Sequence, residues 1–135
     1  MMTPRFLTDR VAVSPQIDPS EIAALVDAGF VAFVSHRPDG EAADQPTHAA
    51  LSAAAEAAGA RFIALPCRGL PGPEAVDGTR KILTETGEGR ILMFCAAGMR
   101  SSAAWAMASV ADGARPDEVI ATAAGAGYDL SRLPL

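Results

Sequence analysis

One short segment of the sequence holds the residue types that perform nucleophilic chemistry on an anion. Cys95 follows an apolar run and precedes Gly98, Arg100 and Ser101, so the segment reads Cys-x-x-Gly-x-Arg-Ser. A loop that leads from a strand into a helix favours a thiolate, because backbone N–H groups and the helix N-terminus carry partial positive charge. The guanidinium of Arg100 can hold two oxygens of a phosphate or sulfate at once. The segment therefore predicts a cysteine nucleophile in an anion-binding loop.

The other residues of the segment suit a loop that surrounds an anion. Small alanines leave its centre open, and a glycine permits backbone conformations that a side chain would obstruct. A cysteine at the end of a buried strand can also be a plain core residue, but an arginine beside a helix start is unfavourable unless an anion lies between them. We predict catalytic residues Cys95, Arg100 and Ser101, with the loop formed by Ala96, Ala97, Gly98 and Met99.

The segments around this loop alternate between the two types of secondary structure. Apolar runs predict strands at residues 31–34, 61–65 and 90–94, and an edge strand at 11–13 with residues 5–7 beside it. Helical patterns cover residues 18–28, 47–58, 74–86, 98–110 and 116–126. Such alternation is typical of βαβ units. We expect an α/β fold: one compact three-layer domain over residues 1–135, with a mainly parallel sheet of about four to five strands flanked by helices.

Ligands of such sheets bind beyond the carboxyl ends of the strands. Three loops meet there, after residues 34, 65 and 94. Besides the Cys95 loop, they offer the accessory candidates Asp39, Arg37, Cys67 and Arg68. Asp39 is a general-acid candidate, although Pro-Asp-Gly is also a turn sequence. Arg37 can hold an anion or form a surface salt bridge, and Cys67 can resolve an oxidised Cys95 by forming a disulfide or can be a small buried residue.

Five further side chains have simpler interpretations in the sequence. His36 lies in a polar loop, where a histidine can act as a proton donor but is expected to be solvated, and His48, in an alanine-rich helix, receives no role. Met99 is expected to pack in the core with Trp105 and Met107.

Composition narrows the class of partner. The chain has 135 residues and a formal net charge of −5, which argues against general binding to nucleic acid or to an anionic membrane. No apolar run approaches the length of a membrane span, and no signal segment is visible, so we expect a cytoplasmic location. Two cysteines and two histidines at these spacings match no metal pattern, and no cofactor is expected. The expected partner is a small anionic compound, either phosphorylated or a persulfide; the sequence does not determine the oligomeric state.

The chain also resembles a known family over nearly its whole length. Four segments carry the resemblance: residues 14–17 (Ser-Pro-Gln-Ile), 37–41 (Arg-Pro-Asp-Gly-Glu), 95–101 and 124–130 (Ala-Gly-Ala-Gly-Tyr-Asp-Leu). They are similar to the phosphatase-like domain of beta-lactamase hydrolase-like proteins, within the cysteine-phosphatase superfamily. The resemblance implies a dual-specificity-phosphatase-like fold. It also implies a hydrolase in which Cys95 attacks phosphorus to form a phosphocysteine, Arg100 holds the phosphoryl oxygens and Ser101 is the partner of the thiolate.

Three local features keep other functions open. Four residues separate Cys95 from Arg100, as in rhodanese sulfurtransferases, where phosphatases have five. Phe94 stands where phosphatases usually have histidine, and the loop with Cys67 and Arg68 lacks the usual aspartic acid. A rhodanese-type sulfurtransferase or persulfide carrier on Cys95 needs no general acid. A third hypothesis is a non-catalytic anion-binding or thiol redox module.

Overall fold

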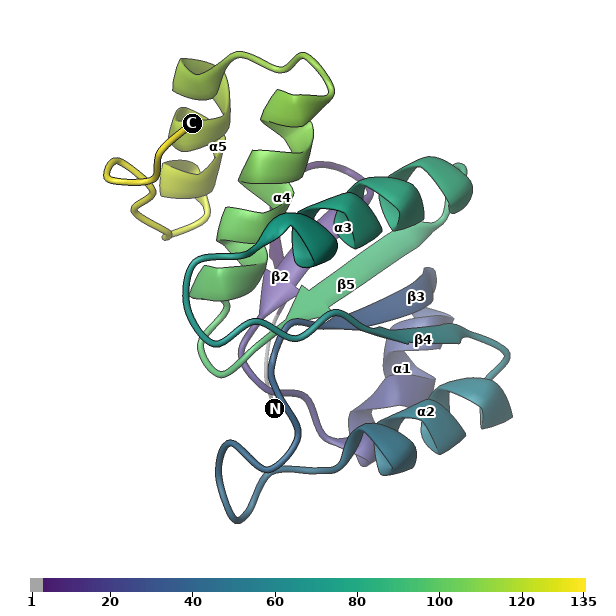
Figure 1. Ribbon diagram of the computed structural model, residues 1–135. Helices are drawn as coiled ribbons and strands as arrows, with labels where there is room; N and C mark the ends of the chain where they lie inside the picture. Colours follow the sequence, from purple (N-terminus) through teal and green to yellow (C-terminus); the bar gives the residue numbers. More distant parts are fainter. Residues whose placement is uncertain (1–3) are drawn as a thin grey trace.

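The computed structural model describes residues 4–135. Five strands and five α-helices follow one another in the order drawn in Figure 1. The strands are β1 (Arg5–Phe6), β2 (Val11–Ser14), β3 (Phe30–Ser35), β4 (Arg61–Ala64) and β5 (Arg90–Phe94). The helices are α1 (Ile22–Asp27), α2 (His48–Ala57), α3 (Pro73–Glu85), α4 (Met99–Ala111) and α5 (Pro116–Gly125), and a 3-10 turn, η1 (Pro19–Glu21), precedes α1.

The strands form one sheet in the order β1-β2-β5-β3-β4. Only β1 is antiparallel to its neighbour, so the expectation of a mainly parallel sheet is confirmed. The edge-strand prediction for residues 11–13 is wrong, because the two-residue strand β1 covers β2 on its outer side. All four residues of β2 are buried, as its place between β1 and β5 requires.

Each face of the sheet is covered by a layer of helices. Residues alternate between the two faces along a strand, so Val11 and Val13 pack with α3, α4 and α5, whereas Ala12 packs with α1 and α2. Figure 1 shows these two helical groups on opposite sides of the strands. The predicted three-layer α/β architecture is therefore confirmed.

The four parallel strands end on one row of the sheet. Phe94, the last residue of β5, is in register with Ser14 of β2 and Ser35 of β3, and Ser35 is in register with Ala64 of β4. Beyond this row the backbone pairing continues, since His36 N–H donates to Phe94 O over 2.8 Å. The loops after β3, β4 and β5 therefore leave the sheet side by side, as the sequence predicts.

Candidate active site

The loop after β5 turns around the sulfur of Cys95. The Gly98 N–H donates to Cys95 Sγ over 3.1 Å, and Cys95 is 1% exposed. The loop continues directly into α4, whose first backbone N–H groups lack partners within the helix. This arrangement supplies donors and partial positive charge next to a thiol, as an anion-binding loop requires.

Gly98 is the one residue of this loop whose backbone excludes other amino acids. Its φ is 96°, in the left-handed region, and a Cβ at this position would overlap the hydroxyl of Tyr128. That hydroxyl also donates to Ala97 O over 3.3 Å. Tyr128, which lies in the segment after α5, therefore packs against the Cys95 loop and leaves no room for a side chain at position 98.

Arg100 is held by the loops that follow β3 and β4. Its Nη1 and Nη2 donate to Glu41 Oε2 and Oε1 over 2.8 and 2.7 Å, and Nη1 also donates to Cys67 O over 2.8 Å. The Arg100 guanidinium in turn holds the pKa of Glu41 down at about 2. Glu41 is therefore a carboxylate that orients Arg100 and is not a proton donor near neutral pH.

The contacts of Arg100 leave part of its binding capacity unused. A guanidinium has about five N–H donors, and the three hydrogen bonds above use both protons of Nη1 and one of Nη2. Among residues 4–135, no side chain or backbone group accepts from Nε–H or from the second Nη2 proton. These two donors lie on the same edge of the guanidinium and suit two oxygens of one anion.

The accessory candidates of the loop after β3 take structural positions. Arg37 Nε donates to Glu41 Oε1 over 3.0 Å, which is the salt bridge considered from the sequence. Asp39 Oδ1 accepts from the backbone N–H of His48 over 2.9 Å, at the first residue of α2. The Asp39 side chain is 53% exposed, and its described contacts lead to His48 and not to the Cys95 loop.

His36 differs most from its expected setting. The prediction that it is solvated is wrong: its side chain is fully buried. Its Nδ1 lies 2.8 Å from Ser101 Oγ, and its Nε2 lies 3.0 Å from Thr79 Oγ1. Because its backbone N–H extends the sheet pairing beyond β3, the ring is kept inside the domain, between α3 and α4.

The loop after β4 places Cys67 near Arg100 and leaves Arg68 exposed. Cys67 is 8% exposed, its Sγ lies 3.6 Å from His36 O, and burial raises its thiol pKa. The charge of Arg100, whose Nη1 donates to Cys67 O, lowers this pKa. Both cysteines are free thiols.

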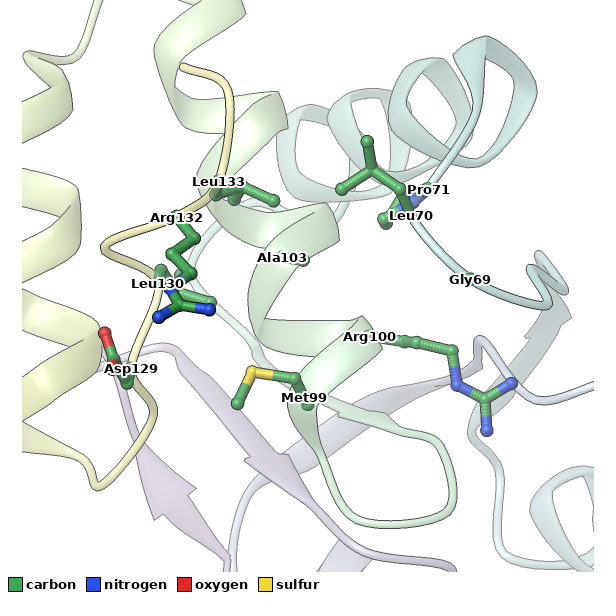
Figure 2. A pocket seen from close by; sticks show the side chains of 10 residues that line it. All are labelled: Gly69, Leu70, Pro71, Met99, Arg100, Ala103, Asp129, Leu130, Arg132 and Leu133. Carbon is green, nitrogen blue, oxygen red and sulfur yellow. The ribbon is translucent and has the colours of Figure 1, made fainter.

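An apolar cavity of about 340 Å³ adjoins the start of α4. Figure 2 shows it between the loop after β4, the first turns of α4 and the C-terminal segment, with the Arg100 guanidinium pointing away from the other lining residues. Met99 lines it and is 44% exposed, so the expectation that Met99 packs in the core is wrong. Its place at the first residue of α4, directly after the loop, turns it outward.

Residues 3–112 match the family model of the beta-lactamase hydrolase-like protein, phosphatase-like domain. The chain belongs to this family. The beta-lactamase hydrolase-like proteins of two Xylella fastidiosa strains, Temecula1 and 9a5c, are each 33% identical to it over 127 residues. The alignment covers 93% of this chain and 30% of each relative, so the chain spans less than a third of their length.

Solved structures of phosphatases share the fold of this phosphatase-like domain. A proposed phosphatase from Neisseria meningitidis, nma1982, is 28% identical, with a TM-score of 0.78 over 94% of this chain and 90% of its own. PTPMT1 is 17% identical, with a TM-score of 0.76 over 97% of this chain and 89% of its own. The fold predicted from the family resemblance is therefore confirmed.

Three polar residues of this phosphatase-like site were not predicted. Glu41 lies inside a quoted segment, but nothing in its spacing links it to Arg100, 59 residues later. His36 and Thr79 did carry a signal. His36 directly follows a buried parallel strand, and Thr79 shares the buried face of α3 with Ala75 and Ile82 at helical spacing.

The described residues contain no cluster of three or more His, Cys, Asp and Glu side chains that could hold a metal ion. Within the same range, every helix is too short or too polar to cross a bilayer.

Proposed function

We propose that this domain is a cysteine-dependent phosphatase that acts through a phosphocysteine on Cys95. The observation that carries the proposal is the pairing of a loop that donates to Cys95 Sγ with an arginine whose Nε and Nη2 edge is used by no hydrogen bond among the described residues. An anion bound on that edge does not displace Glu41, which uses the Nη1 and Nη2 end. Arg100 can therefore be oriented and occupied at the same time.

The reaction follows from the roles proposed for these groups. The Cys95 thiolate attacks the phosphorus of a phosphate monoester, the bond between phosphorus and the ester oxygen breaks, and that oxygen leaves with the electron pair and then takes a proton from solvent. Water then attacks the phosphocysteine, releases inorganic phosphate and regenerates the thiolate. Arg100 and the loop N–H groups stabilise the charge on the phosphoryl oxygens in both steps, and Ser101 is the proposed partner of the thiolate as it leaves the phosphocysteine in the second step.

The proposed enzyme works without a strong general acid for the leaving alcohol. The loop after β4 carries no carboxylate, Glu41 is held ionised with a pKa of about 2, and Asp39 caps α2. General-acid catalysis contributes about 10²–10⁴-fold. Substrates whose alcohols leave without protonation are therefore favoured.

PTPMT1 has been crystallised with PI(5)P, and a phosphorylated compound is the substrate class we propose here.

The direct test measures the hydrolysis of a phosphate ester by the purified domain. Hydrolysis of para-nitrophenyl phosphate that disappears in Cys95→Ser and falls sharply in Arg100→Ala supports the proposal. Arg80→Ala is the matched control, because Arg80 also pairs with a carboxylate, that of Asp112, far from the loop. Hydrolysis that survives Cys95→Ser would refute the phosphocysteine.

The same preparation tests the sulfurtransferase hypothesis. The four-residue spacing between Cys95 and Arg100 favours it. Thiocyanate formed from thiosulfate and cyanide, with no phosphate released from the ester, would replace the phosphatase proposal by sulfur transfer on Cys95. Inactivity in both assays would favour the anion-binding or redox module.

A further inference from the structure

Three buried polar side chains connect the helix after the Cys95 loop to the neighbouring helix. Ser101 of α4, His36 after β3 and Thr79 of α3 are each fully buried. The Ser101 Oγ to His36 Nδ1 distance is 2.8 Å, and the His36 Nε2 to Thr79 Oγ1 distance is 3.0 Å. This series of hydrogen bonds ends at a fourth group, the backbone oxygen of Ala75, which lies 2.7 Å from Thr79 Oγ1. The phosphatase mechanism proposed above uses neither His36 nor Thr79.

The direction of each hydrogen bond in this series follows from the Ala75 carbonyl. A carbonyl oxygen only accepts, so the single hydroxyl proton of Thr79 points to Ala75 O. Thr79 Oγ1 must then accept from His36, and the Nε2 of His36 carries a proton. A neutral imidazole has one N–H, so Nδ1 accepts, and the partner that donates to it is the hydroxyl of Ser101.

The surroundings of His36 keep the imidazole neutral. Burial is the larger cause and the charge of Arg100 the smaller, and together they lower its pKa to about 4. A second proton on Nδ1 would also leave Ser101 without its acceptor.

We infer that His36 and Thr79 are positioning residues for the Cys95 loop, which hold the hydroxyl proton of Ser101 on His36 Nδ1 and so withhold it from the Cys95 sulfur. In the resting protein, the Ser101 hydroxyl is directed to His36 Nδ1, and the described donor to Cys95 Sγ is the Gly98 N–H at 3.1 Å. Ser101 can donate to a thiolate only if His36 changes to the Nδ1–H tautomer. The tautomer of a buried histidine thus sets the role of the serine that follows the catalytic arginine.

Nitrogen-15 NMR of the histidine rings reads the tautomer directly. The chain has two histidines, so a His48→Gln variant assigns the signals. We expect neutral His36 with Nε2 protonated near neutral pH. Finding Nδ1 protonated, or a doubly protonated ring, would overturn the inference.

A change at Thr79 should reverse the direction of the hydrogen bond between His36 and Ser101. Thr79→Val keeps the shape of the side chain and removes the acceptor for His36 Nε2–H, so we expect the Nδ1–H tautomer, which donates to Ser101 and frees its proton. Thr79→Ser is the matched control, since it retains the hydroxyl and should retain the Nε2–H tautomer. A Thr79→Val protein that folds and keeps the Nε2–H tautomer would contradict the role given to Thr79.

The reactivity of Cys95 connects the tautomer to the loop. Alkylation by iodoacetamide is followed on the Cys95 peptide by mass spectrometry across pH. We expect the midpoint of the profile to stay unchanged in Ser101→Ala, to move to lower pH in Thr79→Val, and to return in the double variant. A clearly higher midpoint pH in Ser101→Ala would show that Ser101 already donates to the thiolate. An unchanged midpoint in Thr79→Val would show that the tautomer of His36 does not affect Cys95. Either result overturns the inference.

The inference deepens the proposed function, and its link to Cys95 rests on the role proposed there for Ser101. The NMR and alkylation measurements require no turnover. A protein without phosphatase activity can therefore still show the predicted tautomer, and an active phosphatase can still refute it.

Discussion

Arg100 and Glu41 form a two-pronged ion pair, with Nη1 to Oε2 and Nη2 to Oε1 distances of 2.8 and 2.7 Å. The pair joins the first turn of α4 to the loop after β3. Arg37 donates to the same carboxylate from within that loop. Glu41 is thus held by two arginines and fixes the direction of the one that is proposed to bind substrate.

Glu41→Gln should lower kcat/KM for para-nitrophenyl phosphate by about tenfold, because the neutral amide cannot accept from both Arg100 nitrogens and the guanidinium loses its orientation. Steady-state kinetics checks this. Glu85→Gln is the control, since Glu85 pairs with Arg61 on the surface. A variant that binds inorganic phosphate more tightly and turns over faster would instead identify Glu41 as a competitor of the substrate.

Acid should destabilise the domain through His36. The folded-state pKa is lowered from 6.5 to about 4, so between these values the unfolded chain binds a proton that the folded chain does not. The free energy of unfolding should therefore fall as the pH drops through this window, by about 3 kcal/mol for this residue. Urea titrations of the wild-type protein and of His36→Asn check this; an equally steep pH dependence in the variant would contradict it.

Gly98→Ala should destabilise the domain more than the same change at Gly113. Both glycines have left-handed backbones, with φ of 96° and 102°, but a Cβ meets the Tyr128 hydroxyl at Gly98 and nothing within 4 Å at Gly113. Gly113→Ala measures the backbone cost alone, about 1 kcal/mol. We expect Gly98→Ala to cost about 1–3 kcal/mol more. Equal urea midpoints for the Gly98→Ala and Gly113→Ala proteins would mean that the Tyr128 side chain moves aside without measurable cost.

The proposed absence of a general acid should produce a preference for good leaving groups. Because an aryl oxide leaves without protonation and an alkoxide does not, we expect kcat/KM for an aryl phosphate to exceed that for a simple alkyl phosphate by about 10²-fold or more. Values of kcat/KM across a series of esters with leaving groups of rising pKa test this, because kcat/KM reports the step in which the ester oxygen leaves. A flat series would show that a group in the protein protonates the leaving oxygen.

The sequence predicts the parts of the site that are contiguous in the chain. The Cys95 loop, the strands that end beside it and the α/β layers all follow from local patterns, and the structure confirms the elements. Contacts across the chain do not follow in this way. Glu41 meets Arg100 because β3 and β5 are neighbours in the sheet, a pairing that no local pattern reveals. The burial of His36 likewise depends on α3 and α4 closing over it from later in the chain.

The contact of Tyr128 with the Cys95 loop bears on how this unit can be cut or transplanted. The family match ends at residue 112, before α5 begins, yet the phenol that limits Gly98 and donates to Ala97 O lies beyond it. A fragment trimmed to the matched range would retain every proposed reacting group and lose Tyr128, which packs against their loop. For expression, grafting or chimera design, the working boundary therefore lies past Tyr128, at the buried Leu130 or later.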